Sequence, residues 1–399
     1  MRIGMMTDLY TPHISGITNY INLNKRYLEQ AGHEVFVFTF GDLDYKDDET
    51  HIFRSPGLQL VDSGYYLSFH YNRQVKALLQ TMDVVHVHHP FLSGRLALRY
   101  CRPLRIPILF TNHTRYDLYA QAYLPLLPEE ISASFLESYM PSFCNAVDLV
   151  ISPSTGMAQV LQKLGVKSHI EIVPNGVELQ LFHQNGQSAQ RTKIGFKAED
   201  IIFAFSGRLA PEKNLSFLIK AFAGVAEAIE NVHLVIIGGG PEEQALKNQA
   251  AGSGASKRVH FFGMLDYDLL PAYLAMCDVF VTASLSEVHP LSVIEAMATG
   301  LPVLGIQSVG VGDTIEDGIT GFLSSEDQAA FAAKMTRLCL DRELRRKMGQ
   351  TARKTTEKYA IERTTQTMLE HYKHLVYKAE PRKRGLIVRL QSILEKFRG

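Results

Sequence analysis

Short apolar runs alternate with longer amphipathic stretches along most of this chain. In the first half, the apolar runs span residues 2–6, 34–39, 84–88, 108–111 and 149–152. Helical periodicity lies between them, for example over residues 17–31 and 130–144. Strands that alternate with helices of this length favour a parallel sheet with helices packed on it. The first half therefore predicts a doubly wound α/β domain.

The pattern occurs a second time. A polar stretch over residues 183–193 interrupts it, and new apolar runs follow at 201–206, 232–237, 259–262, 279–282 and 302–305. A single hydrophobic core rarely grows beyond roughly 250–300 residues, so a chain of 399 residues also favours two cores. We expect two Rossmann-like doubly wound domains, the first over residues 1–185 and the second over residues 186–360.

The C-terminal end has a helical pattern in two parts. We expect a helix over residues 361–380, and Pro381 then breaks the pattern. In residues 381–399, PRKRGLIVRLQSILEKFRG, the apolar side chains form one helical stripe and arginines and lysines surround it. This basic amphipathic tail either lies on an anionic bilayer surface or docks on the protein itself, and the sequence leaves both open.

Composition excludes several classes of protein. Lys+Arg and Asp+Glu both number 41, so no net charge attracts the chain to nucleic acid, and no nucleic-acid recognition motif is present. The four cysteines lack CxxC spacing, which argues against a zinc site or a disulfide framework. The N-terminus lacks the apolar segment of a signal peptide, and no run of about 18 apolar residues could span a bilayer. The sequence predicts a cytoplasmic protein.

The segment SGRLAPEKN, residues 206–214, follows an apolar strand and precedes a helical stretch. The end of a parallel strand aims such side chains into a ligand crevice. Arg208 and Lys213 supply two cations beside a helix N-terminus, whose free N–H groups also favour anions. The segment predicts a diphosphate site, whereas an exposed turn with surface ion pairs is the alternative.

Two carboxylates, Glu287 and Glu295, flank a second predicted helix N-terminus at residues 291–298. A loop carboxylate there accepts hydrogen bonds from sugar hydroxyls, and a carboxylate one turn into the helix binds a ribose diol. Taken alone, this spacing more often belongs to two solvated acids at the end of a helix.

Three segments in fixed order carry a family resemblance: SGRLAPEKN, VIIGGGPEEQAL at 235–246 and SLSEVHPLSVIEAMATGLPVLG at 284–305. With TDLYTPHISGITNYI at 7–21, they resemble the family-four retaining glycosyltransferases of the GT-B fold, diacylglycerol glucosyltransferases among them. The resemblance implies two Rossmann-like domains that face each other across a cleft, with the helix of residues 361–380 crossing back to the N-terminal domain. It also implies a retaining, metal-independent hexosyltransferase that uses a nucleotide sugar such as UDP-glucose.

The resemblance assigns roles to individual residues. Arg208 and Lys213 would hold the donor diphosphate as it leaves, which is electrostatic catalysis. Glu287 would bind the transferred sugar and Glu295 the ribose of the nucleotide. Gly16, in the loop after the first strand, would let the backbone approach the diphosphate. Further donor-binding or catalytic positions implied by the family are His113, Gly240, Pro241, His289, Pro290, Leu291 and Gly310.

This sequence departs from the family at Val288-His289-Pro290, where glycines are more usual. Pro290 has no N–H, so one backbone donor to the sugar or phosphate is missing, and His289 is expected to compensate. The identity of the sugar stays open.

Other polar patterns in the sequence do not predict a binding site for the donor. The D-x-D patterns at 42–44 and 266–268 are expected to be surface acids, because Arg208 and Lys213 already supply the cations; we expect no metal and no cofactor. His86 and His88 share one face of a strand without a third metal ligand nearby in sequence. His89, which follows them, is expected to face the acceptor.

The acceptor is predicted to be a membrane lipid such as diacylglycerol. The apolar, aromatic stretch over residues 116–128 resembles the corresponding segment of diacylglycerol glucosyltransferases. Arginines at 95, 99, 102 and 105 either add to a membrane-facing patch or form an ordinary solvated helix face. We expect a peripheral protein at an anionic surface, the inner face of the plasma membrane. A transferase for soluble sugars or metabolites, or a non-catalytic nucleotide-binding module, remains the alternative.

Overall fold

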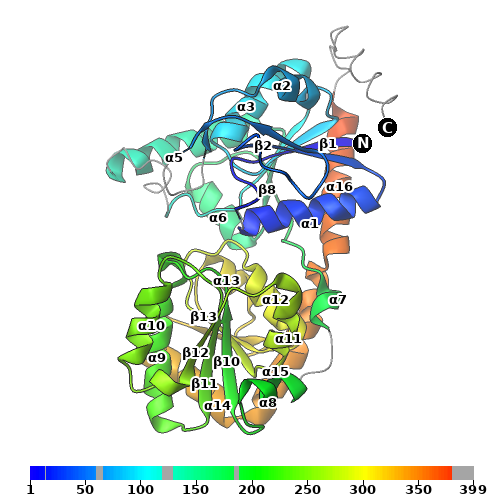
Figure 1. Cartoon of the computed structure of the whole chain (residues 1–399). Helices are drawn as coiled ribbons and strands as arrows, with labels where there is room; N and C mark the ends of the chain where they lie inside the picture. Colours follow the sequence, from blue (N-terminus) through cyan, green and yellow to red (C-terminus); the bar gives the residue numbers. More distant parts are fainter. Residues whose placement is uncertain (14, 60–65, 119–128, 184–187, 380–399) are drawn as a thin grey trace. The chain divides into compact units, whose positions relative to one another are not determined.

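The computed structural model describes residues 1–13, 15–59, 66–118, 129–183 and 188–379 (Figure 1). Residues 1–175, together with the segment from Ile361 onward, form a first compact unit, and Gly176–Ala360 form a second. The division thus lies N-terminal to the expected boundary at 185/186. The reason is that helix α7 (Leu179–Phe182) packs Leu179 and Phe182 into a core of the second unit. The amphipathic tail expected at 381–399 lies outside the described residues.

The first unit contains a seven-stranded sheet in the order β3-β2-β1-β6-β7-β8-β9, and every neighbouring pair is parallel. Its strands are β1 (Arg2–Met6), β2 (Glu34–Phe40), β3 (Ile52–Ser55), β6 (Val84–Val87), β7 (Ile108–Thr111), β8 (Leu149–Ser152) and β9 (Ile170–Ile172). A short antiparallel pair joins β4 (Leu58–Gln59) to β5 (Tyr66–Leu67). Its helices are α1 (Gly16–Gln30), α2 (Arg73–Leu79), α3 (Leu92–Tyr100), α5 (Glu129–Ala146), α6 (Thr155–Lys163) and α16 (Ile361–Lys378), with the short 3-10 helix η1 (Arg102–Leu104).

The second unit contains a six-stranded sheet in the order β12-β11-β10-β13-β14-β15, again parallel throughout. Its strands are β10 (Ile201–Ser206), β11 (Val232–Ile237), β12 (Val259–Gly263), β13 (Val279–Thr282), β14 (Val303–Ile306) and β15 (Gly321–Ser324). Besides α7, its helices are α8 (Ser188–Ile194), α9 (Leu215–Ala228), α10 (Glu243–Ala251), α11 (Leu270–Ala275), α12 (Leu291–Thr299), α13 (Val309–Thr314), α14 (Gln328–Leu340) and α15 (Arg342–Thr355). Its 3-10 helices are η2 (Pro211–Lys213), η3 (Ser256–Arg258), η4 (Tyr267–Leu269) and η5 (Thr356–Tyr359). Two parallel sheets confirm the predicted α/β fold with two Rossmann-like domains.

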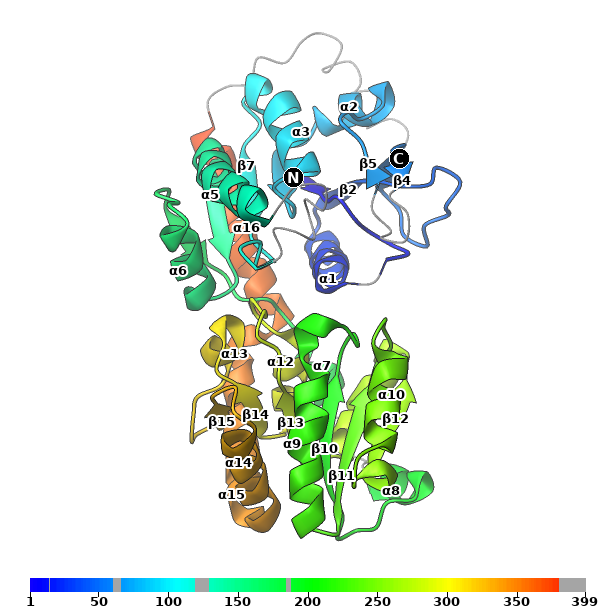
Figure 2. The same cartoon turned by 90° about the vertical axis from the view of Figure 1, so that its left-hand side faces the viewer.

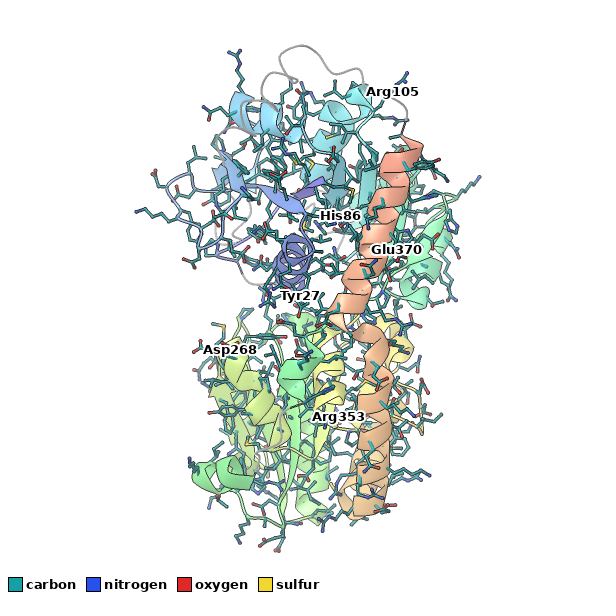
Figure 3. The ribbon with its side chains drawn as sticks, turned by 90° about the vertical axis from the view of Figure 1, so that its right-hand side faces the viewer. Tyr27, His86, Arg105, Asp268, Arg353 and Glu370 are labelled. Atoms are coloured by element: carbon teal, nitrogen blue, oxygen red, sulfur yellow. The ribbon has the colours of Figure 1, made fainter. Side chains whose placement is uncertain are left out.

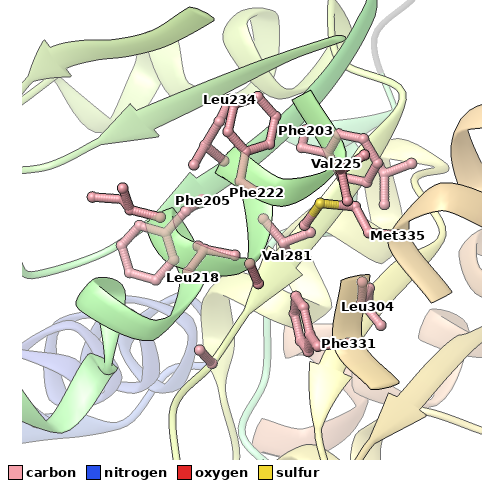
Figure 4. Packing of buried hydrophobic residues seen from close by; sticks show 14 of the residues in the cluster. Phe203, Phe205, Leu218, Phe222, Val225, Leu234, Val281, Leu304, Phe331 and Met335 are labelled. Atoms are coloured by element: carbon pink, nitrogen blue, oxygen red, sulfur yellow. The ribbon is translucent and has the colours of Figure 1, made fainter. Parts of the chain in front are cut away.

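Apolar strands are buried because helices cover both faces of this second sheet. Helices α9 and α14 lie side by side over one face, where Phe222 and Phe331 belong to the same buried cluster as Phe203 of β10 (Figures 2 and 4). Helices α11 and α12 contribute to the core on the other face, with Leu274 and Ile294. Full burial of such a side chain contributes about 1.5–3 kcal/mol, so these strands carry apolar residues at almost every position.

The last described helix, α16, belongs to the first unit although it follows the second in sequence. Its residues Met368, Leu369 and Tyr372 are buried in the core that β1, β2 and β6 line. Glu370 of the same helix is exposed (Figure 3). Polar contacts with α1 add to this packing, because Thr365 Oγ1 donates to Asn24 Oδ1 at 3.2 Å. The helix therefore completes the hydrophobic core of the first unit.

Each sheet has a point where the winding direction reverses. In the first unit, the chain moves outward from β1 to β2 on one side and from β6 to β7 on the other. The corresponding neighbours in the second sheet are β10 and β13. Connections diverge at such a point and leave a crevice beyond the carboxyl ends of the strands, which is where doubly wound sheets bind ligands.

Candidate functional site

The carboxyl ends of β10 and β11 are joined by their backbones. Leu209 N–H donates to the carbonyl of Gly239 at 2.9 Å, and Gly207 N–H donates to that of Ile237 at 3.0 Å. A Cβ on Gly238 would lie 1.9 Å from the carbonyl oxygen of Gly207, and one on Gly240 would lie 2.3 Å from that of Leu209. These glycines are thus required for contact between the two loops. The predicted donor contacts of Gly240 and of the exposed Pro241 stay predictions.

Arg208 and Lys213 follow β10, as the sequence predicts, but their environments differ. Arg208 is exposed and has no hydrogen bond or ion pair with the residues that the structure describes. Lys213, the last residue of η2, donates to Glu287 Oε1 at 2.5 Å, and both side chains are about one-fifth exposed, at 22% and 19%. The sequence placed Lys213 and Glu287 in one site, but it did not predict that the two side chains form an ion pair.

The Glu287 carboxylate is ionised in this pair. Burial on its own would raise its pKa, but the Lys213 ammonium beside it outweighs that effect and holds the pKa of Glu287 below its usual value. An ionised carboxylate accepts hydrogen bonds through both of its oxygens and donates none, which is the chemistry needed to bind hydroxyl groups.

The Glu287 loop is fixed through its main chain. Gly310 N–H, in α13, donates to the carbonyl of Glu287 at 2.9 Å, and Ser308 Oγ donates to the carbonyl of Ser284 at 3.0 Å. A Cβ on Gly310 would lie 2.5 Å from the Val288 carbonyl carbon and 2.6 Å from the Glu287 oxygen. Gly310 is therefore needed for this close approach, and through it the loop after β14 positions Glu287.

Helix α12 begins directly after this loop. Pro290 occupies its N-cap position and makes no side-chain capping hydrogen bond. The first amides of α12, beginning at Leu291, thus have no side-chain acceptor at the cap and favour an anion there. His289 is buried and its ring packs edge-on to Tyr359 at 5.0 Å between centroids. Burial and the nearby Lys358 lower the pKa of His289 to about 3, so the imidazole is neutral.

Glu295 lies one turn into α12 and is only 6% exposed. It accepts a hydrogen bond from the hydroxyl of Tyr267 at 2.8 Å. Burial raises the pKa of Glu295 to about 7, although this hydrogen bond opposes the shift. Tyr267 was missed by sequence reasoning, which treated Asp266-Tyr267-Asp268 only as a pair of acids. Both aspartates are exposed, as expected, and the residue between them contacts the site.

The raised pKa of Glu295 predicts a pH-dependent stability. Since the folded protein holds this proton more tightly than the unfolded chain, the stabilisation is complete below about pH 4.5 and is lost as pH rises through about 7. The unfolding free energy of the wild type should decrease by at most about 3 kcal/mol between pH 5 and 8, and Glu295→Gln should abolish this decrease. Denaturant unfolding of both proteins at the two pH values measures this difference. Glu343→Gln, on the exposed face of α15, is the control, and equal pH slopes for wild type and Glu295→Gln would refute the prediction.

In the first unit, His113 follows β7 and is partly exposed. Its Nε2 lies 3.0 Å from His88 Nδ1, and its ring packs on Tyr20 at 4.7 Å between centroids. Burial, together with His89, lowers the pKa of His113 to about 3, so it acts as a neutral hydrogen-bonding group.

Behind this pair, His86 is fully buried and both of its nitrogens are engaged. Nδ1 lies 2.7 Å from the Tyr372 hydroxyl of α16, and Nε2 lies 2.7 Å from Thr111 Oγ1. Through these contacts His86 and His88 support His113.

Gly16 is the first residue of α1 rather than a loop residue. Ser15 caps this helix by accepting from Thr18 N–H at 3.1 Å. Gly16 is exposed, and a Cβ built on it would meet no atom within 4 Å. Unlike Gly310, it has no packing contact that would explain a glycine.

The structure therefore gathers the predicted residues into two groups, each at the carboxyl edge of its own sheet. Lys213, Glu287 and Gly310 are in direct contact in the second unit, with Glu295 in the helix that follows. Gly16 and His113 lie in the first unit, after β1 and β7.

Comparisons with known proteins identify the family of this chain and its fold. Residues 14–181 match the family model "Glycosyltransferase Family 4", and residues 186–355 match "Glycosyl transferases group 1". An alpha-monoglucosyldiacylglycerol synthase of Streptococcus pneumoniae is 31% identical over 81% of this chain and 75% of its own length. The synthase of the same name from Acholeplasma laidlawii is 28% identical over 82% and 86%.

Solved structures show the same fold at lower identity. Sucrose-phosphate synthase from Thermosynechococcus elongatus superposes with a TM-score of 0.77 at 21% identity, covering 94% of this chain and 98% of that one. HepE from Anabaena, in complex with UDP-glucose, gives a TM-score of 0.75 at 19% identity, covering 94% and 100%.

Proposed function

This chain belongs to the family-four glycosyltransferases of the GT-B fold, and we propose that it moves a hexose from UDP-glucose or a similar nucleotide sugar to a membrane lipid such as diacylglycerol. Transfer from a nucleotide sugar is the activity of the family. The hexose, the lipid acceptor, retention of configuration and independence from metal ions are parts of our proposal.

One observation carries the donor assignment. The Lys213–Glu287 pair lies at the carboxyl ends of β10 and β13, which is the switch point of the second sheet. The ammonium and the exposed Arg208 supply positive charge for a diphosphate, and the uncapped start of α12 adds backbone donors. When a donor binds, its diphosphate competes for Lys213, and the Glu287 carboxylate becomes available to the hydroxyls of the sugar.

The remaining donor contacts follow from the same placement. The buried Glu295 and the exposed Tyr267 form an acceptor and donor pair suited to a ribose diol. In the first unit, the unobstructed Gly16 would let a phosphate reach the first amides of α1.

The chemical step needs no nucleophilic side chain. The acceptor oxygen forms its bond to the anomeric carbon on the face that the diphosphate leaves. The bond from that carbon to the diphosphate oxygen breaks, and the acceptor proton passes to the departing phosphate. Arg208 and Lys213 stabilise the charge that develops on it. This route retains the configuration of the donor.

The lipid acceptor is supported by the names of the relatives and by one surface of the first unit. Helices α2 and α3 pack together, since Lys76 and Arg99 both lie over the ring of Tyr100, at 4.9 and 5.5 Å. Together with η1 and the residue that follows it, these helices present exposed cations, and the exposed Phe69 precedes α2. These cations are Arg73, Lys76, Arg95, Arg99, Arg102 and Arg105. Each cation near an anionic bilayer contributes about 1 kcal/mol of attraction.

We also propose that the protein is peripheral on the cytoplasmic face of the plasma membrane. Its four cysteines are all free and buried, as expected of a reducing compartment. Among the described residues, no helix has both the length and the apolarity needed to cross a bilayer.

A soluble acceptor is the second candidate, because a D-inositol 3-phosphate glycosyltransferase of Nocardia farcinica is also a relative, 29% identical over 73% of this chain. One screen separates the candidates: UDP- and GDP-sugars are offered with diacylglycerol in neutral vesicles, in anionic vesicles, or with soluble sugars and inositol phosphates. We expect transfer to diacylglycerol, faster in anionic vesicles, and an α-linked first product by NMR. Transfer to soluble acceptors alone would refute the lipid proposal, a β-linked product would refute retention, and no release of nucleoside diphosphate would indicate a non-catalytic module.

A further inference from the structure

His89 connects the two strands that flank the switch point of the first sheet. It follows β6, and its Nδ1 lies 3.2 Å from the main-chain nitrogen of Asp8, which follows β1. The Asp8 carboxylate is engaged separately, because it accepts from Ser93 N–H at 2.7 Å and Leu92 N–H at 3.3 Å at the start of α3. Both partners are therefore held in place at the point where this sheet opens a crevice.

The contact with Asp8 fixes which nitrogen of His89 carries the hydrogen. A main-chain amide only donates, so Nδ1 must be the acceptor. Thr7 Oγ1 lies 3.0 Å from the same nitrogen, but its own hydrogen is directed to the carbonyl of Leu9 at 2.9 Å. Burial lowers the pKa of His89 even though Asp8 opposes the shift, so the ring is neutral. A neutral imidazole without hydrogen on Nδ1 carries it on Nε2.

The Nε2–H group has no hydrogen-bond partner among the described residues, although the side chain as a whole is 98% buried, being 2% exposed. The Nε2 atom of the neighbouring His88 also has no hydrogen-bond partner, but unlike that of His89 it is fully buried. Both histidines follow β6, and their contacts differ: His88 contacts His113, whereas His89 contacts Thr7 and Asp8, which follow β1. The next residues along the β1 side, Leu9 to His13, line a cavity of about 360 Å³.

We propose that His89 is an acceptor-binding residue whose Nε2–H donates a hydrogen bond to the oxygen of the attacking hydroxyl group. This inference rests on the proposed function, in which the first unit binds the acceptor. The hydroxyl keeps its own hydrogen, one lone pair accepts from His89, and the other is directed at the anomeric carbon.

The same geometry excludes His89 as a general base. A base needs a lone pair on Nε2, and the hydrogen would then sit on Nδ1, directly opposite the N–H of Asp8. Two donors facing each other at 3.2 Å would leave both buried groups unsatisfied. His89 therefore positions the acceptor, and the acceptor proton leaves with the phosphate.

Two conservative variants separate the two nitrogens of His89. Asn places its amide group at the level of Nδ1 and leaves nothing at Nε2, whereas Gln places its amide nitrogen at the level of Nε2. We expect His89→Asn to raise the KM for the acceptor about 3- to 10-fold, the usual effect of one lost neutral hydrogen bond. The KM for the donor should change less than the KM for the acceptor. His89→Gln should recover most of the acceptor KM. His374→Asn, on the exposed end of α16, is the matched control.

NMR of wild-type protein with ¹⁵N-labelled histidine tests the same inference without any substitution. We expect hydrogen on Nε2 of His89 in the free protein and a shift of that signal when acceptor is added. Hydrogen on Nδ1, or an unchanged acceptor KM in a folded His89→Asn, would overturn the inference. If wild type transfers no sugar, the proposed function fails, and the NMR result still decides the position of the hydrogen on His89.

Discussion

Lys213→Ala should reduce the rate of sugar transfer about 100- to 1000-fold, which is the usual cost of removing one group that stabilises a developing oxyanion. The reason is the loss of the ammonium that meets the diphosphate as the glycosidic bond breaks. The variant should also be less stable by roughly 1–3 kcal/mol, because Glu287 keeps a largely buried charge without its partner. Single-turnover rates with a saturating nucleotide sugar and denaturant unfolding measure the two effects.

A double variant distinguishes catalysis from stability. Lys213→Ala combined with Glu287→Gln removes both charges of the pair, so most of the lost stability should return while transfer stays at least as slow. Recovery of activity together with stability would mean that Lys213 acts only by holding the Glu287 loop. If folded Lys213→Ala transferred sugar at the wild-type rate, the proposal that the donor diphosphate binds at Lys213 would be wrong.

Gly310→Ala, which replaces a single hydrogen by a methyl group, should reduce both stability and sugar transfer. The added carbon would lie 2.5–2.6 Å from main-chain atoms of Glu287 and Val288, which cannot rotate away as a side chain would. We expect a loss of about 1–3 kcal/mol in unfolding free energy, as for other overpacked sites. Transfer should fall about 100-fold, because a displacement of about 1 Å at the reacting centre has that effect.

Gly224→Ala provides the matched control. Gly224 lies on the exposed face of α9, and a Cβ there would meet no atom within 4 Å. The change should stabilise the helix by roughly 0.5–1 kcal/mol and leave transfer unchanged. If Gly310→Ala behaved like this control, the loop after β14 would have no part in positioning Glu287.

The fold was predictable because both sheets are buried on both faces. Runs such as residues 201–206 are almost continuously apolar, and a parallel sheet covered by helices is the arrangement that buries them. The boundary at 185/186 was displaced because α7 is a short apolar segment whose partner, α12, lies more than a hundred residues further along the chain. Such a pairing leaves no periodic signal in the sequence.

The site was only partly predictable, because a sequence gives residue types at strand ends and not their contacts. Lys213 and Glu287 were expected in one site, but their ion pair joins loops that follow different strands. The sequence did not predict the role of Tyr267, because a single tyrosine between two exposed acids forms no periodic pattern that would indicate a contact. The orientation of His89 depends on the main-chain amide of Asp8, which follows β1 and lies more than eighty residues away in sequence, so it is visible only in three dimensions.

The chain crosses twice between its two units, after Asn175 and after Ala360, and these crossings are neighbours. Val177 N–H donates to the carbonyl of Tyr359 at 2.9 Å, and Val177 pairs with Ala360 in a parallel bridge. In topological terms the second unit is an insertion, a continuous segment whose two ends meet, inside a discontinuous host. A gene fragment that stops at the first crossing would therefore encode a host without α16, with the apolar surface beneath that helix open to water.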